Sequence, residues 1–216
     1  MKLLLLAFPL ALLGQTPLSL DVWFHDPTLF GSTLRVSYNQ EAFQTVAAGQ
    51  FRATSPTASW LTYCTDLKNP LSAGLFTAIP IEIATNPFHQ NPDWVVGGIQ
   101  RATATVAFFG PTVSNAAEAS ALQGLVWESL YDTDLNPAAG AFRIQGDTSL
   151  ISSWLTNPTW EQTSIVGAPW WQPVNYLLEY RPAQGLIGEP IPEASTWSAI
   201  AFGALVIAWA VWRRAK

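Results

Sequence analysis

In the first third of the chain, apolar and β-branched residues interleave with polar ones in short runs. These runs cover residues 20–26, 32–40, 43–49, 50–55 and 59–67, and Gly, Pro, Asn or Ser separates them. Such runs, bounded by turn residues, predict strands. Residues 68–95 contain four prolines and are expected to form loops. We likewise expect residues 169–171 to lie in a loop.

The middle of the chain changes to a helical pattern. A helix is expected at residues 99–109, a longer one at 116–131 and a short one within 148–157. The longest opens with Ser114 or Asn115 as N-cap and Glu118 in its first turn. A strand at residues 174–182 closes the body, and residues 185–193 are expected to be a tether. The order predicts an α+β fold, with β-sandwich or barrel-like strands and an inserted helical segment.

A helical wheel of residues 116–131 places Gln123 on the apolar side, near Val126. Glu118, Glu128 and Asp132 fall on the opposite side. Gln123 is therefore predicted to point into the protein. A buried amide is costly unless hydrogen bonds satisfy it, and a bond to the backbone is the ordinary solution.

Both ends of the chain are apolar. The run Leu3–Leu13 after one Lys is typical of a secretory leader, here residues 1–19. The uncharged run Trp197–Trp212 precedes a basic cluster and predicts a membrane helix with a cytoplasmic C-terminus. Buried helices are the alternative at both ends. Residues 20–188 then form the body, long enough for one domain with a core.

A short motif precedes the C-terminal helix. It consists of Ile191, Pro192, Glu193, Ala194 and Ser195. With the helix and the basic tail, it resembles the PEP-CTERM sorting signal of Gram-negative bacteria, with Ala194 in place of the second Pro. The resemblance implies residues 189–216 as a sorting signal read by an exosortase. It also implies transient anchoring in the inner membrane, then delivery to the cell envelope or extracellular matrix.

The charge of the body argues against one class of partner. The chain carries a formal net charge of −5. Without the four basic residues of the ends and without Glu189 and Glu193, the body carries −7. An acidic body is not expected to bind nucleic acid.

Cys64 is the only cysteine of the chain, so no disulfide can form within it. On its predicted strand, Trp60, Cys64 and Asp66 share one face and Tyr63 lies on the other. A single cysteine is commonly a small buried apolar residue. In an exported chain it is also a candidate for special chemistry.

The segments around Cys64 and Gln123 resemble the paired motifs of thioester domains, known from bacterial surface adhesins. The matching positions are Tyr63, Cys64 and Asp66 in the first motif, and Leu122, Gln123, Leu125, Val126 and Trp127 in the second. Thr65 and Gly124 depart from the pattern. The resemblance implies a Cys64–Gln123 thioester. Candidates for its surround are Trp60, Tyr63, Asp66, Val126 and Trp127, with Asp66 or His89 assisting proton transfer.

The expected function is covalent attachment, through this thioester, to a nucleophile on a surface or matrix macromolecule. The alternative is a non-covalent structural matrix or biofilm protein that keeps the same fold. Neither turns over, so the chain is not expected to be an enzyme. A cysteine hydrolase using Cys64 with His25 or His89 is disfavoured, because no nucleophile-elbow signature surrounds the cysteine.

Residues 132–143 begin like a calcium loop, with Asp132, Asp134 and Asn136 at alternate positions. Pro137 and Arg143 occupy the sixth and twelfth positions, where such a loop has Gly and Glu. The sequence therefore predicts a polar turn at the end of the helix and neither a metal nor a cofactor.

Overall fold

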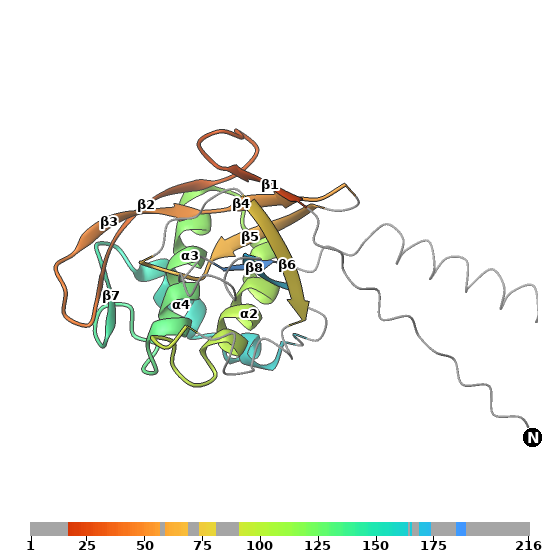
Figure 1. Ribbon diagram of the computed structural model, residues 1–216. Coiled ribbons are helices and arrows are strands. Elements are labelled where there is room, and N and C mark those ends of the chain that lie inside the picture. Colours follow the sequence, from red (N-terminus) through yellow and green to blue (C-terminus); the bar gives the residue numbers. More distant parts are fainter. Residues whose placement is uncertain are drawn as a thin grey trace, which may run out of the picture.

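The computed structural model describes residues 17–56, 59–68, 74–80, 91–163, 165, 169–173 and 185–188. This part of the chain is a mixed α+β fold, and all its strand pairs are antiparallel. Figure 1 shows strands and helices packed against one another. Among the described residues, no helix has the length and apolarity that a membrane crossing requires. The sorting motif, the C-terminal membrane helix and most of the leader lie outside these residues.

One sheet closes into a barrel in the order β1-β4-β5-β9-β8-β6. The strands are β1 (Pro17–Val22), β4 (Phe51–Thr54), β5 (Ser59–Cys64), β6 (Gly74–Pro80), β8 (Pro169–Pro173) and β9 (Leu186–Gly188). β1 pairs with β4 on one side and with β6 on the other, which closes the ring. The predicted leader, residues 1–19, overlaps β1 at its first three residues.

The second sheet has the order β3-β2-β7. Its strands are β2 (Gly31–Tyr38), β3 (Gln44–Gly49) and β7 (Phe142–Gln145). Only Gln50 separates β3 from β4, so the chain passes there from this sheet into the barrel. Gly49 lies opposite Gly31, and a Cβ on Gly49 would lie 2.4 Å from the Gly31 Cα. The crossing therefore depends on glycine at a close approach of two backbones.

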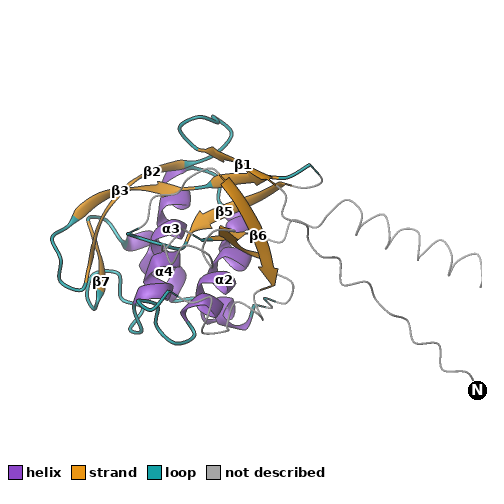
Figure 2. Cartoon of the chain, in the orientation of Figure 1, coloured by secondary structure: helices purple, strands orange, loops and turns teal. Residues whose placement is uncertain are grey.

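The three α-helices within the described residues are α2 (Gly98–Phe109), α3 (Ala116–Tyr131) and α4 (Ser149–Leu155). Short 3₁₀ turns follow α2 at Gly110–Thr112 and α4 at Pro158–Gln162. The predicted capping is confirmed: Asn115 Oδ1 accepts from the Glu118 N–H at 3.0 Å, and Glu118 Oε2 accepts from the Ser114 N–H at 2.7 Å. All three predicted helices are present, and Figure 2 shows them packed together beneath β1, β2 and β3.

Helix α3 is the centre of the core. It contacts α2 and α4, all three strands of the second sheet (β2, β3 and β7), and β5 of the barrel. Every residue from Ala119 to Tyr131 is buried. The wheel is right for Gln123 but wrong for Glu128 and Asp132, which are 0% and 6% exposed. The wheel assumes one solvated face, whereas α3 is covered on all sides.

Three predictions about loops are also wrong. Residues 68–95 contain strand β6, whose proline stands at its last position. Trp170 and Trp171 lie in β8, and the expected tether contains β9, whose Leu186 and Ile187 are fully buried. These strands are short, and their barrel partners rather than their own patterns determine them. The strand predicted at residues 174–182 lies outside the described residues.

Candidate functional site: the Cys64–Gln123 pair

Cys64 is the last residue of β5 and is 5% exposed. The pairing of β5 with β4 ends at Thr62, which lies opposite Phe51, whereas β9 continues alongside to Cys64 and Leu186. Both faces of the strand are covered here, because all residues from Thr62 to Asp66 are buried. The edge of Cys64 that faces away from β9 therefore needs a substitute for the missing β4 residue.

The side chain of Gln123, from the middle of α3, supplies that substitute. The backbone N–H of Cys64 donates to Gln123 Oε1 at 2.9 Å. Gln123 Nε2 donates to the carbonyl oxygen of Cys64 at 2.8 Å. Gln123 is 0% exposed. The amide thus continues the strand ladder as a further strand would, and it joins two positions 59 residues apart.

This arrangement confirms that Gln123 points inward, and it also shows the ordinary solution for a buried amide, namely hydrogen bonds to backbone. The unusual feature is that this backbone belongs to Cys64. The amide carbon is held next to the one residue of the chain that carries a thiol. The N–H donor on Oε1 also polarises the carbonyl in the manner of an oxyanion-hole donor.

The apolar residues predicted to surround the pair share its core. Tyr63, Val126 and Trp127 belong to the same buried cluster as Cys64, and Trp60 packs against that cluster while partly exposed. The Tyr63 hydroxyl accepts a hydrogen bond from Gln50 Nε2 at 3.1 Å. Sequence patterns did not identify the β9 contribution, Leu186 and Ile187, which are both 0% exposed.

Asp66 is buried in the turn after β5 and serves that turn. Its carboxylate accepts from the Lys68 N–H at 2.8 Å and from Asn91 Nδ2 at 3.3 Å. Nearby, the Tyr131 hydroxyl accepts from the Leu67 N–H at 3.2 Å. Burial raises the pKa of Tyr131, and the charge of Asp66 adds to the shift. Asp66 and Tyr131 together fix the chain where it leaves Cys64.

One of the two histidines considered for catalysis, His25, lies within the described residues. His25 is exposed in the loop between β1 and β2, where its ring meets that of Phe24 edge to face with 4.3 Å between centroids. His89 lies outside the described residues. The described part of the chain therefore gives no support to a hydrolase.

No protein-family model, curated protein or solved structure matches the chain. Its function is therefore inferred from the site and the sequence alone.

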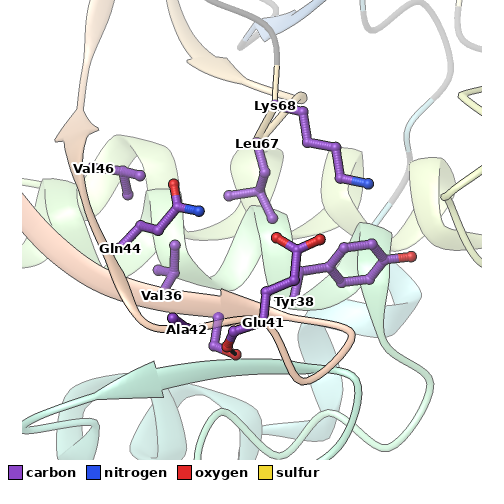
Figure 3. A pocket seen from close by; sticks show the side chains of 9 residues that line it. Val36, Tyr38, Glu41, Ala42, Gln44, Val46, Leu67 and Lys68 are labelled. Atoms are coloured by element: carbon purple, nitrogen blue, oxygen red, sulfur yellow. Dashed lines mark hydrogen bonds between the residues drawn. The ribbon is translucent and has the colours of Figure 1, made fainter.

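A pocket of about 250 Å³ opens beside the segment that follows Cys64. Figure 3 shows Leu67 pointing toward Val36 and Lys68 extending over Tyr38, with 5.2 Å from the Lys68 Nζ to the ring centroid. The lining residues are Val36, Ser37, Tyr38, Glu41, Ala42, Gln44, Val46, Leu67 and Lys68. Neither Cys64 nor Gln123 lines this pocket, so it adjoins the pair without opening onto it.

A second buried polar residue on α3, Glu128, was missed by sequence reasoning. It is 0% exposed, and neither carboxylate oxygen has a hydrogen-bond partner among the described residues. Burial raises the pKa of Glu128 to about 8, and the charges of Asp132 and Asp134 add to the rise. The spacing of Glu128 and Asp132, one helical turn apart, was the available signal, but the wheel assigned both to solvent.

Proposed function

We propose that the chain is an exported cell-envelope or extracellular-matrix protein that attaches covalently to a partner through a Cys64–Gln123 thioester. The observation that carries the proposal is the paired hydrogen bond between the Gln123 amide and the backbone of Cys64. It holds Cys64, whose thiol would be acylated, beside the Gln123 amide, whose nitrogen would be displaced, within the buried core.

The bond would form by condensation of the two side chains. The Cys64 sulfur attacks the amide carbon of Gln123, the C–S bond forms, and the C–N bond breaks. The thiol proton leaves with the amide nitrogen as ammonia. An amine on a partner can then attack the same carbonyl, form an amide with the Gln123 side chain and release Cys64 as a thiol.

Two features of the site favour this chemistry. The Cys64 N–H lies 2.9 Å from Oε1, within the range of donors that stabilise a developing oxyanion. The pair is nearly inaccessible to solvent, with Cys64 5% and Gln123 0% exposed. A thioester is lost to hydrolysis, so exclusion of water is a condition for its survival.

Export is supported by the sequence. The apolar N-terminal run, the sorting-like motif Ile191–Ser195 and the uncharged run before the basic tail point to passage through the inner membrane. The partners proposed are an exosortase-type machinery, the inner membrane as a transient anchor, and a surface or matrix macromolecule that bears the nucleophile. The acidic body does not favour nucleic acid.

A second candidate function is a non-covalent structural matrix protein. One observation favours it: the Gln123 amide is satisfied by Cys64 through both its oxygen and its nitrogen. The fold therefore accounts for a buried glutamine without any covalent bond.

The intact mass of the full chain distinguishes the two functions. A thioester makes the chain lighter than its sequence by one ammonia. Methylamine then adds at Gln123, and Cys64 becomes open to alkylation. An unmodified mass, together with a Cys64 that alkylates once the protein is unfolded without methylamine, would rule out the covalent function and leave the structural one.

The matched control is Cys64→Ala. Both hydrogen bonds that join position 64 to Gln123 involve the backbone of position 64, so this variant keeps them and lacks the sulfur. It should show no ammonia loss and no methylamine adduct. If an ammonia loss persisted in Cys64→Ala, it would have to come from another residue.

A further inference from the structure

The buried carboxylate of Glu128 lies in a group of three acidic side chains at the C-terminal end of α3. Glu128 is in the last turn of the helix, Asp132 is its C-cap, and Asp134 is in the loop beyond. Ligand oxygens of the three residues all lie within 4.8 Å of one another. Glu128 and Asp132 are buried and Asp134 is exposed, so the group opens to solvent on the loop side.

Three carboxylates at this distance repel one another unless a positive charge lies among them. Within the described residues, the ion pairs are Arg52–Asp26 and Lys68–Asp93, and neither involves this group. Arg101 is nearby, but its Nη2 donates to the carbonyl oxygens of Ser129 and Asp132 at 2.9 and 2.8 Å. Among the described residues, no cationic side chain therefore forms an ion pair with the group, and Arg101 acts on Glu128 only through its nearby charge.

Glu128 differs from the two aspartates in how its oxygens are satisfied. Asp132 accepts three backbone N–H groups, from Thr133, Asp134 and Phe142. Asp134 Oδ1 accepts the N–H of Asn136 at 2.9 Å, and the same N–H lies near enough to Glu128 to lower its pKa slightly against the larger rise from burial. Both oxygens of Glu128 stay without a partner among the described residues, although the residue is 0% exposed. A buried carboxylate of this kind is expected to hold a proton unless it coordinates a cation or pairs.

We propose that Glu128, Asp132 and Asp134 bind a divalent cation, and that the cation is calcium. All the ligand atoms are carboxylate oxygens, which hard cations prefer. Ligand oxygens that lie within 4.8 Å of one another can all reach one ion. Calcium accepts irregular sets of carboxylate oxygens, whereas magnesium demands near-ideal octahedral geometry and keeps several waters.

This site differs from the 12-residue calcium loop that residues 132–143 match at their start but not at the sixth and twelfth positions. That loop requires an acidic ligand at its twelfth position, where Arg143 stands. Here the acidic ligand comes from the helix before the loop, one turn ahead of Asp132. The cation would join the end of α3 to the loop that leads to β7. This proposal does not depend on the thioester.

The test is a calcium titration of the full chain after treatment with chelator, followed by calorimetry and by thermal unfolding. We expect one saturable site per chain and a rise in Tm. Binding should persist in excess magnesium. Displacement of calcium by an equal concentration of magnesium would overturn the assignment of the ion. The absence of saturable binding would overturn the site.

Three variants sharpen the titration. Glu128→Gln and Asp134→Asn should each weaken calcium binding roughly ten-fold or more, because each removes a ligand charge. Asp134 is exposed, so its variant tests the site even if Glu128→Gln folds poorly. Glu118→Gln, an exposed change in the first turn of the same helix, should bind calcium as the native chain does. Native affinity in Glu128→Gln would overturn the proposal.

Discussion

Gln123 and Glu128 lie five residues apart on one helix, and both are 0% exposed. They differ in what satisfies them. The Gln123 amide donates to and accepts from the backbone of Cys64, whereas both oxygens of Glu128 are without partners in the described part of the chain. The Gln123 amide completes a contact within the chain. The Glu128 carboxylate is placed to bind a cation, as proposed above.

The difference shows how buried polar residues can be interpreted. A satisfied group such as Gln123 holds the fold together, and any chemistry it has must act on its own partner. An unsatisfied group such as Glu128 costs free energy in the folded state. That cost is reduced when the carboxyl is protonated or when a cation binds. The same helix thus carries one residue whose loss should destabilise the fold and one whose neutralisation should not.

The largest effect is expected at Gln123. Gln123→Ala removes both hydrogen bonds and leaves the N–H and C=O of Cys64 buried without partners. Each such group costs about 1–3 kcal/mol, so the free energy of unfolding should fall by roughly 3–5 kcal/mol. Urea unfolding measures it.

Ser120→Ala is the matched comparison on the same helix. The Ser120 hydroxyl lies 3.0 Å from the carbonyl oxygen of Ala48 and 2.8 Å from that of Ala116. Its removal should cost about 1 kcal/mol. A Gln123→Ala variant no less stable than Ser120→Ala would show that the amide is not what completes the strand.

The second-largest effect is expected in the pH dependence of the free energy of unfolding, measured with chelator present. The pKa of Glu128 is raised from 4.5 to about 8 in the folded state. Between these values the folded state holds a proton that the unfolded state has lost. The contribution of Glu128 to stability is therefore fully present below pH 4.5 and falls as the pH rises toward 8, by up to about 1.4 kcal/mol per pH unit. Asp132, Asp134 and Arg101 are the charged groups that act on Glu128.

Glu128→Gln should remove this slope and should unfold no more easily than the native chain at pH 8. Chemical denaturation at several pH values between 5 and 8 measures both. The same slope in the variant would show that another group causes it, and the contrast with Gln123 would be lost.

A smaller effect is expected at Gly140, which has a φ of +86°. A Cβ there would lie 2.2 Å from Asp132 Oδ2. Gly140→Ala should cost about 2 kcal/mol and weaken calcium binding, because the carboxylate must move. Gly146→Ala is the control: its φ is +119°, but a Cβ would meet nothing within 4 Å. It should cost about 1 kcal/mol and leave calcium binding unchanged.

The smallest effect is expected at an exposed polar contact of α3. Asn115→Ala removes the cap hydrogen bond to the Glu118 N–H, and the cost should be about 1 kcal/mol because water replaces the lost partner. Thermal unfolding measures it. A cost as large as that of Gln123→Ala would mean that burial is not what separates the two positions.

The sequence predicted those parts of the fold that local signals determine. The cap at Asn115 fixes the start of α3, and the strand that ends at Cys64 has a β-prone pattern. The inward direction of Gln123 followed from its wheel position. Its contact with Cys64 was anticipated only through resemblance of the two motifs, since no local signal joins positions 59 residues apart.

Other parts could not be predicted, because the information is not local. β8 and β9 are too short to show a pattern, and their barrel neighbours define them. Glu128 was assigned to solvent because a wheel describes one helix alone, whereas β2, β3, α2 and α4 all pack against α3. A buried carboxylate without a partner becomes visible only when all the surrounding elements are in place.

The pairing of Cys64 with β9 has a consequence for timing. In a chain that leaves the cell from its N-terminus onward, β5 emerges early, Gln123 later, and Leu186 only near the end. The strand edge of Cys64 opposite Gln123 pairs with β9, so that edge is covered last. If the proposed thioester formed before that moment, it would meet water. On the proposed function, we therefore expect the thioester to form only after almost the whole body has been exported.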